Sequence, residues 1–524
     1  MGCGNANLDV VVVGSGAAGL TAALTAQLQG AKVTLVESEN HLGGTSAIGG
    51  GNLWIPGNNP MGRAGHMDNL DGAFVYLRRV SGSRPTVENA RAFIEHGPRL
   101  VDFIETRSAI RFSSIARHDY HADWEGAGFG RSLEPEPLDA GRLLASQNDW
   151  FRTNPTRAPL TYSEYRAGAD LELVTERRRR DVRTQGAALI AGLGHAALDA
   201  GVRMLRGKGL ARLDRMGKSG FRVDLTDGTR ISTPAVVLAA GGFAADPATR
   251  RALLPSIDFV SLAAGRAAGD GIRAGLNCGA GLSGIGDGWL GAVHVPEDSR
   301  SPFLVVRELA LPGSMLVNGD GLRFVNEALG YNDVGRGMLA FDPSRGNYPA
   351  ERSWLIFDAA FRSRHSVLGV SPDASIPAGW HKAGSIAALA ASLKVPFAGL
   401  ERSVQRMNEA ATKGFDDEFG RGGDAHQRFN GDPNHEPNPC LGTIAQAPFF
   451  AAPIVPGLCG TKGGLAVDEK ARVLDRDGGP IAGLFACGDV AETVMGFGYA
   501  GAGASIGPAM TFGMLAGETI VKPN

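Results

Sequence analysis

The chain has 524 residues, of which 75 are glycine and 43% are hydrophobic, and its 52 basic and 54 acidic side chains nearly cancel. The glycine content is roughly twice the usual share of about 7%, but it lacks the three-residue period of collagen, and the hydrophobic content argues against a disordered linker. The balance of charge gives no sign of a nucleic acid partner. At this length, two or more core-bearing units are expected.

The cysteines form no recognisable pattern. They are Cys3, Cys278, Cys440, Cys459 and Cys487. Their odd number and wide spacing argue against a disulfide framework or a zinc site, and a reducing cytoplasm fits them best. The histidines likewise lack metal-ligand spacing, so no metal site is expected. No basic segment precedes the first apolar run, and no stretch approaches about 18 uninterrupted apolar residues, so neither a signal peptide nor a membrane span is expected.

The first 36 residues predict a βαβ unit. Leu8–Val13 is a short apolar, β-branched run, and the leucines of Ala17–Gln29 recur every four residues on one helical face. Lys32–Val36 is typical of a second strand. Because a unit of this kind requires a parallel sheet covered by helices, an α/β fold is expected.

Further α/β segments lie in two later parts of the chain. The middle part predicts a helix, a strand, a hairpin around Asp227-Gly228 and a buried strand, at Thr184–Ala200, Val202–Leu205, Phe221–Leu225 with Arg230–Ser232, and Ala235–Ala240. The C-terminal part predicts a strand at Leu484–Cys487 and a helix from about Pro508. From about Gly286 to Ala445 the sequence is irregular and richer in Pro, Asn and aromatic residues, which indicates an inserted domain.

A phosphate-binding motif lies between the first strand and the first helix. Residues 14–19 read GSGAAG, which matches GxGxxG, and Glu37 ends the second strand 23 residues beyond Gly14. The first glycine permits the tight turn, the second lets a pyrophosphate approach the helix N-terminus, and the third lets helix pack on strand. Glu37 is placed to accept the hydroxyl groups of an adenosine ribose.

Two glycine clusters distinguish FAD from NAD. Five glycines fall in residues 41–51 and five in residues 496–507. Glycine lets the backbone lie close against a large ligand group. One FAD extended between the two ends of the chain accounts for both clusters, with Asp489 on the ribityl chain, whereas NAD accounts for one. FAD is therefore the expected cofactor.

The expected architecture is an α/β fold with a Rossmann-like FAD-binding domain, built on a parallel sheet, and an inserted α+β substrate-capping domain. The FAD-binding domain is discontinuous, over residues 1–285 and 446–524, and residues 286–445 form the catalytic domain. In this arrangement both glycine clusters belong to one domain.

Residues 494–513, with the sequence VMGFGYAGAGASIGPAMTFG, resemble the C-terminal flavin loop of the 3-ketosteroid Δ1-dehydrogenases, which belong to the fumarate reductase/succinate dehydrogenase flavoprotein superfamily. The resemblance covers nearly the whole chain. Further segments fall in the family's order: Gly44-Thr45-Ser46, Ala239–Phe243, Gly269-Asp270-Gly271, Arg323-Phe324-Val325-Asn326-Glu327 and Gly460-Thr461-Lys462-Gly463-Gly464. Motif and resemblance together indicate the following FAD-binding residues: Gly14, Gly16, Ala17, Ala18, Gly19, Glu37, Ser38, Gly44, Thr45, Ser46, Gly50, Gly51, Ala240, Gly241, Gly488, Asp489, Ser505 and Ile506.

The resemblance implies desaturation of a 3-ketosteroid between C1 and C2. In that family a tyrosine hydroxyl and a backbone amide four residues later bind the ketone oxygen, and the matching positions are Tyr499 and Gly503. A second tyrosine, matched by Tyr331, removes the C2 proton while C1 gives hydride to flavin N5. A third, matched by Tyr120, assists that base. Since an unperturbed tyrosine has a pKa near 10, such a base needs a helper to act near pH 7.

The sequence also departs from the family. A proline usually precedes the tyrosine base and others flank the ketone-binding tyrosine, whereas this chain has Gly330, Ala500 and Ala502. No histidine stands where succinate dehydrogenases attach flavin, so non-covalent FAD is expected. The expected substrate is a small apolar, steroid-like ketone, and the electron acceptor is unassigned. Three alternatives stay open: a 3-ketosteroid Δ4-(5α)-dehydrogenase, a dehydrogenase or enoate reductase acting on a non-steroid, and a non-redox hydratase.

Overall fold

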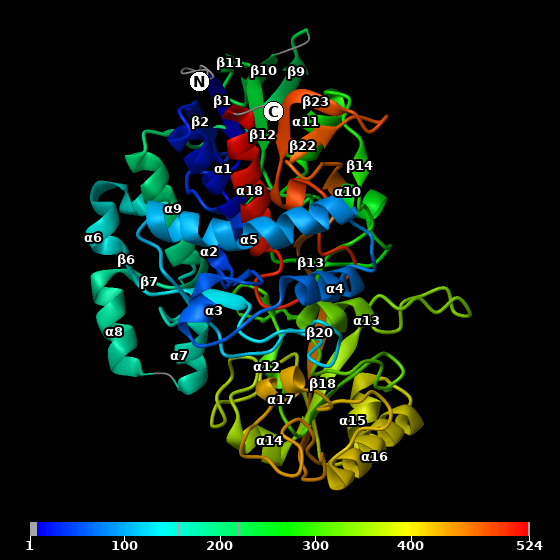
Figure 1. Ribbon diagram of the computed structural model, residues 1–524. Coiled ribbons are helices and arrows are strands. Elements are labelled where there is room, and N and C mark those ends of the chain that lie inside the picture. The colour runs from blue at the N-terminus through cyan, green and yellow to red at the C-terminus, as the bar shows by residue number, and fades with distance from the viewer. Residues whose placement is uncertain are drawn as a thin grey trace.

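The computed structural model describes residues 8–155, 157–168, 170–217, 220–265, 267–298 and 300–521. Figure 1 shows two lobes, with the N- and C-terminal segments together in the upper one and most of the segment from α12 to α17 in the lower one. The centre of the upper lobe is a six-stranded sheet. Its strands, in spatial order, are β22 (Arg472–Leu474), β23 (Pro480–Ala486), β12 (Ala235–Leu238), β1 (Asp9–Val13), β2 (Lys32–Val36) and β8 (Arg203–Leu205).

All neighbouring pairs in this sheet are parallel except β22 with β23. The predicted α/β fold with a parallel sheet is thus confirmed. Val10 and Val12 point into one core, whereas Val11 and Val13 point into another, because side chains alternate across a strand. Both faces of β1 are therefore buried, which explains its continuous apolar sequence.

Helices from both ends of the chain cover one face of the sheet. α1 (Ala17–Leu28) packs along α18 (Ile506–Val521), with α9 (Gln185–Asp199) and the long α5 (Val87–Arg107) beside them (Figure 1). A Cβ added at Gly513 would lie 2.5 Å from the Ala18 carbonyl oxygen, so the close contact of α1 and α18 requires glycine there. The other face is covered by the antiparallel sheet of β9 (Leu210–Arg215), β10 (Phe221–Leu225) and β11 (Arg230–Thr233), and by α11 (Asp270–Asn277).

The lower lobe is built on a second, mixed sheet. Its strands are β13 (Val260–Ser261), β15 (Gly288–His294), β16 (Phe303–Leu304), β17 (Ser314–Val317), β18 (Ser353–Asp358), β19 (His381–Ala383) and β20 (Phe449–Thr461). Its helices are α12 (Arg307–Ala310), α13 (Tyr331–Gly337), α14 (Ala359–Arg364), α15 (Ile386–Leu393), α16 (Phe397–Lys413) and α17 (Ala425–Asn430). This helix-covered sheet has the α+β character predicted for the cap, although β13 and β20 lie outside residues 286–445.

β20 joins the two lobes. Its first half pairs with β18 and β19, its second half pairs with β13 and β15, and Thr461 at its end lies beside Asp489 of the upper lobe. The domain boundaries at residues 285 and 445 stay a prediction.

Shorter elements connect these parts. They are α2 (Gly44–Ile48), β3 (Leu53–Trp54), α3 (Asn59–Arg63), α4 (Leu70–Val80), β4 (Phe112–Ser114), β5 (Ser132–Pro135), β6 (Leu138–Asp139), α6 (Ala140–Leu144), η1 (Ala145–Trp150), α7 (Tyr162–Ala167), α8 (Leu171–Arg180), β7 (Val182–Arg183), α10 (Pro247–Leu253), β14 (Leu282–Ser283), β21 (Gly464–Leu465) and η2 (Gly488–Val490). No helix in the described ranges is long and apolar enough to cross a bilayer.

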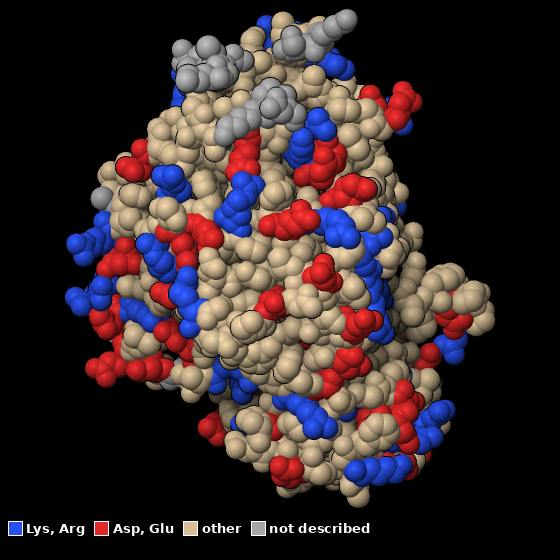
Figure 2. Space-filling model, viewed as in Figure 1, with Lys and Arg blue, Asp and Glu red and all other residues tan. Residues whose placement is uncertain are grey.

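Charges of both signs are interspersed over the face shown in Figure 2. The arginine-rich end of α8 illustrates this mixing. Arg177 pairs with Glu164 at 2.6 Å, and Arg180 pairs with Asp139 at 2.6 Å. These arginines therefore form a solvated, charge-paired helix end rather than a basic patch.

Candidate active site

The glycine-rich turn between β1 and α1 lies against the end of β12. Gly14 has a φ of +104°, and a Cβ there would lie 2.3 Å from the Ala239 carbonyl oxygen, so the turn requires glycine. Gly19 is packed as closely, because an added Cβ would lie 2.0 Å from the Gly14 oxygen. The N-cap residue Gly16 has no side chain to cap α1, and the first helical amide, that of Ala17, donates to Ser46 Oγ. The positive helix N-terminus therefore suits the predicted pyrophosphate.

Glu37 ends β2 beside this turn. Its Oε2 accepts hydrogen bonds from the amide (3.0 Å) and hydroxyl (2.5 Å) of Ser15. Its Oε1 accepts from the Ser38 hydroxyl at 3.1 Å and the Glu39 amide at 3.0 Å. These bonds fix the carboxylate where the sequence places the adenosine ribose.

The segment after β2 reaches back to α1. Ser46 Oγ accepts from the Ala17 amide at 3.2 Å, and Thr45 Oγ1 accepts from the Ala264 amide at 2.9 Å. A Cβ added at Gly44 would meet no atom within 4 Å, so the backbone there borders open space. Residues 44–46, predicted to bind FAD, thus lie against the helix that begins at the predicted pyrophosphate site.

The next residues combine tight packing with an unsatisfied polar group. Gly51 has a φ of +68°, and an added Cβ would lie 2.5 Å from Gln185. The side-chain oxygen of Asn52 is buried without a hydrogen-bond partner. A glycine-rich helix N-terminus, open space beside Gly44 and an unpaired amide oxygen fit a large polar ligand such as FAD.

Gly488 and Asp489, which precede the C-terminal glycine cluster, complete this arrangement. A Cβ added at Gly488, where φ is +74°, would lie 3.2 Å from Ala18 Cβ, which places the turn after β23 against the start of α1. Asp489 Oδ1 accepts a hydrogen bond from the Trp289 indole nitrogen at 3.0 Å. Burial raises the pKa of the Asp489 carboxyl to about 6. Predicted FAD-binding residues from the N-terminal and C-terminal parts of the chain therefore meet at α1.

The three predicted catalytic tyrosines come together from three distant segments of the chain. Tyr120 lies in the loop after β4, Tyr331 begins α13, and Tyr499 lies before α18. The Tyr499 ring centre lies 4.9 Å from that of Tyr331 and 5.6 Å from that of Tyr120, on which it stacks. A Cβ added at Gly330 would lie 2.3 Å from the Tyr120 ring. The departure from proline at this position thus makes room for Tyr120.

Gly503 lies beside the Tyr499 hydroxyl. Its φ is +99°, and an added Cβ would lie 2.4 Å from the Asn52 backbone carbon, so the position requires glycine. Tyr331, Ser505 and the Gly503 backbone each influence the pKa of Tyr499, which places them next to its hydroxyl. A phenol and a backbone amide therefore lie side by side, as a two-donor oxyanion site requires.

Burial raises the pKa of all three phenols. The pKa of Tyr331 is raised well above 10, and its hydrogen bond to Tyr499 raises it further. For Tyr499 the hydrogen bonds of its neighbours oppose the rise, and for Tyr120 the positive charge of Arg117 opposes it. The phenols are therefore protonated near pH 7.

The sequence profile of the FAD binding domain family matches residues 9–506. The chain belongs to this family. It is 37% identical to a 4-oxocyclohexanecarboxylate 2-dehydrogenase of Sinomonas cyclohexanicum, over 99% of this chain and 94% of that protein. It is 35% identical to a 3-oxosteroid 1-dehydrogenase of Mycolicibacterium smegmatis, over 97% and 96% of the two chains. The crystal structure of the 3-ketosteroid Δ1-dehydrogenase from Sterolibacterium denitrificans in complex with 1,4-androstadiene-3,17-dione matches with a TM-score of 0.91 and 32% identity, over 99% of this chain and 100% of that one.

These matches confirm the resemblance stated from the sequence. The FAD-binding protein is a 3-ketosteroid Δ1-dehydrogenase-like flavoprotein and an FAD-dependent oxidoreductase.

Around the tyrosines of this flavoprotein lie groups that the sequence did not indicate. Tyr76, on α4, donates a hydrogen bond from its hydroxyl to the Ala500 carbonyl at 2.8 Å. Lys462 donates from Nζ to the Phe497 carbonyl at 2.8 Å and the Gly498 carbonyl at 2.9 Å. Both bonds restrain the loop that carries Tyr499. Lys462 lies in the family segment GTKGG, so the sequence offered a signal for it. Tyr76 lies in no family segment.

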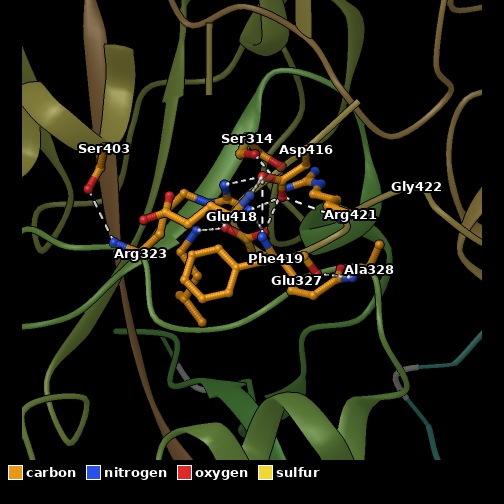
Figure 3. Close-up of polar contacts among 12 residues, drawn as sticks. Ser314, Arg323, Glu327, Ala328, Ser403, Asp416, Glu418, Phe419, Arg421 and Gly422 are labelled. Carbon is orange, nitrogen blue, oxygen red and sulfur yellow. Dashed lines mark hydrogen bonds and ion pairs between the residues drawn. The ribbon is translucent and has the colours of Figure 1, made fainter. Parts of the chain in front are cut away.

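A buried ionic cluster restrains the segment before Tyr331. In Figure 3, Arg323 and Arg421 converge on Glu327, and Arg323 also reaches Asp416. Arg323 Nη2 lies 2.8 Å from Glu327 Oε2 and 2.9 Å from Asp416 Oδ2, and Arg421 Nη1 lies 3.2 Å from Glu327 Oε2. These side chains are at most 2% exposed. Two cations and two carboxylates neutralise one another there, four residues before the predicted base.

Proposed function

We propose that this flavoenzyme desaturates a ring ketone next to its carbonyl group, between C1 and C2 if the substrate is a 3-ketosteroid. The convergence of Tyr120, Tyr331, Tyr499 and the Gly503 amide supports this proposal. The names of two relatives describe dehydrogenation of a ring that bears an oxo group, one a steroid and the other a cyclohexanecarboxylate. Desaturation next to a ring ketone is a single reaction that both kinds of substrate could undergo.

Two fixed donors hold the ketone oxygen in this proposal. The Tyr499 hydroxyl and the Gly503 N–H stabilise the negative charge that develops on that oxygen as the neighbouring carbon loses its proton. Because the charge is larger in the transition state than in the bound ketone, the donors lower the barrier rather than merely tightening binding.

Tyr331 takes the proton from the carbon next to the ketone, and Tyr120 assists it. The C–H electron pair released there forms the new double bond, and the second hydrogen leaves the adjacent carbon with its own electron pair. Bound FAD supplies the acceptor for that hydride. The form of Tyr331 that acts is the phenolate, which has first given up its own proton, and because burial raises the pKa of Tyr331 this form is scarce near pH 7.

An anaerobic titration tests this function. A saturated 3-ketosteroid or a substituted cyclohexanone is expected to bleach the flavin absorbance within one turnover, and a matched cyclohexane without the ketone is expected to leave it unchanged. Product NMR locates the double bond and separates C1–C2 from C4–C5 desaturation. Failure of every cyclic ketone to bleach the flavin would refute the proposal, and reoxidation of reduced flavin by fumarate or an enoate would favour a reductase.

The flavin is expected to be bound non-covalently, since residues 43–52 contain no histidine, cysteine or tyrosine that could form a covalent bond. Acid precipitation of the holoenzyme should therefore leave all yellow colour in the supernatant. Yellow colour retained in the washed pellet would contradict this prediction.

Cytoplasmic location is part of the same proposal, and the free thiols of Cys278, Cys440, Cys459 and Cys487 support it.

A further inference from the structure

Arg117 is a buried cation at the edge of the tyrosine cluster. It lies three residues before Tyr120 and is 5% exposed. Its guanidinium carbon lies 5.1 Å from the centre of the Tyr120 ring, 5.4 Å from that of Tyr162 and 5.2 Å from that of Phe429. Aromatic rings contact the faces of a guanidinium and leave its N–H edges for a planar acceptor.

The N–H edges of Arg117 are only partly satisfied. Nε is buried and has no hydrogen-bond partner, and Nη2 lies 3.3 Å from His426 Nδ1. Burial, together with the Arg117 charge, lowers the pKa of His426 well below its usual value, so this histidine is neutral near pH 7. The contact therefore supplies no negative charge.

No carboxylate within the described ranges pairs with Arg117. Asp119, two residues along the chain, pairs with Arg131 at 2.7 Å. Asp333, which raises the pKa of Tyr120, lies 3.5 Å from His121 Nε2. A buried charge without a counter-ion is costly, and the cost falls when an anionic ligand arrives. The neutral carbon skeleton of a steroid would leave this charge unpaired.

We propose that Arg117 binds a carboxylate of the substrate, so that the enzyme acts on a ring ketone that carries a carboxylate. This inference rests on the proposed function. The ketone end of the substrate lies at Tyr499, Tyr120 stacks on Tyr499, and Arg117 contacts Tyr120. The proposed ketone site and the unpaired cation thus contact the same Tyr120 ring, so a carboxylate carried by the substrate ring would extend towards Arg117. Arg117 donates two parallel N–H bonds to that carboxylate.

The test compares matched acidic and neutral substrates. Anaerobic flavin reduction is measured with 4-oxocyclohexanecarboxylate, its methyl ester and a neutral 3-ketosteroid, for the wild-type holoenzyme and for Arg117→Gln and Arg117→Lys. Wild type is expected to prefer the acid to the ester by about 10²-fold in kcat/KM, since loss of a buried charge pair has an effect of this order. Arg117→Gln should bring the acid-to-ester ratio of kcat/KM to about 1, mainly through a higher KM for the acid, and any change in turnover through the contact of Arg117 with Tyr120 should be shared by both substrates. Arg117→Lys should keep part of it, because lysine retains the charge without the bidentate geometry.

Arg166→Gln is the matched control. Arg166 is exposed and its guanidinium carbon lies 3.9 Å from the centre of the same Phe429 ring, so this variant should keep the wild-type preference. Equal rates with acid and ester in wild type, or an equal loss with both in Arg117→Gln, would overturn the carboxylate site while leaving ketone desaturation intact. If no substrate of the three bleaches the wild-type flavin, the proposed function fails as well.

Discussion

Replacing Tyr331 by phenylalanine is expected to lower the rate of flavin reduction by a factor of about 10²–10⁴, the usual contribution of a general base. The substitution removes one oxygen at the start of α13 and keeps the ring that packs 4.9 Å from Tyr499. Stopped-flow reduction by the best ketone measures the step directly. Substrate binding should change little, since Tyr331 acts on the C–H bond rather than on the ketone oxygen.

The pH profile separates a base from a packing residue. A base works in its deprotonated form, and burial raises the pKa of Tyr331 well above 10, so the wild-type reduction rate should still rise with pH at the alkaline limit of the assay. Tyr331→Phe should lose that rise. A variant that reduces flavin at the wild-type rate, or that keeps the alkaline rise, would remove Tyr331 from this role.

The second large effect is expected at Tyr499. In Tyr499→Phe the ketone oxygen loses one of its two donors, which should lower the reduction rate by about 10²–10³, as for other oxyanion sites. The acidity of the hydrogen next to the ketone depends on that oxygen, so proton removal slows even though the base is intact. Measurement of the deuterium isotope effect at the carbon next to the ketone should show that this step has become more rate-limiting.

Tyr165→Phe serves as the matched control for both substitutions, because Tyr165 lies on α7 and is 54% exposed. Gly503→Ala is a poor counterpart of Tyr499→Phe, since the new Cβ would press on Asn52 and distort the flavin cradle. A Tyr499→Phe enzyme with normal flavin content and a rate within threefold of wild type would show that the phenol does not hold the ketone.

Much of the upper lobe was predictable because its interactions are local. The βαβ unit, the hairpin of β10 and β11 and the helix α9 follow from apolar periodicity and glycine placement within short segments. The helix α5 was not recognised, although Phe93, Leu100 and Ile104 are buried at helical spacing, because Pro98 inside it is a residue that usually marks a helix end. The cap sheet was not resolved into strands, because its partners are far apart in sequence.

The candidate site was predictable only through motifs. Tyr120, Tyr331 and Tyr499 are separated by hundreds of residues, so no spacing rule places them side by side, and the resemblance alone singled them out. Tyr76 and Arg117 stand outside the quoted motifs, and their meaning depends on what surrounds them in the folded chain. Whether a buried charge has a counter-ion depends on the folded structure, which explains why the sequence did not single out Arg117.

The course of β20 limits how this enzyme can be recombined with its relatives. Its first half belongs to the cap sheet and its last residues abut the flavin segment at Asp489, so the strand is visible in Figure 1 running between the two lobes. A chimaera that exchanged residues 286–445 alone would pair a foreign β15 and β18 with the native β20. Exchange of substrate specificity therefore has to transfer the block from β15 through the end of β20 as one unit.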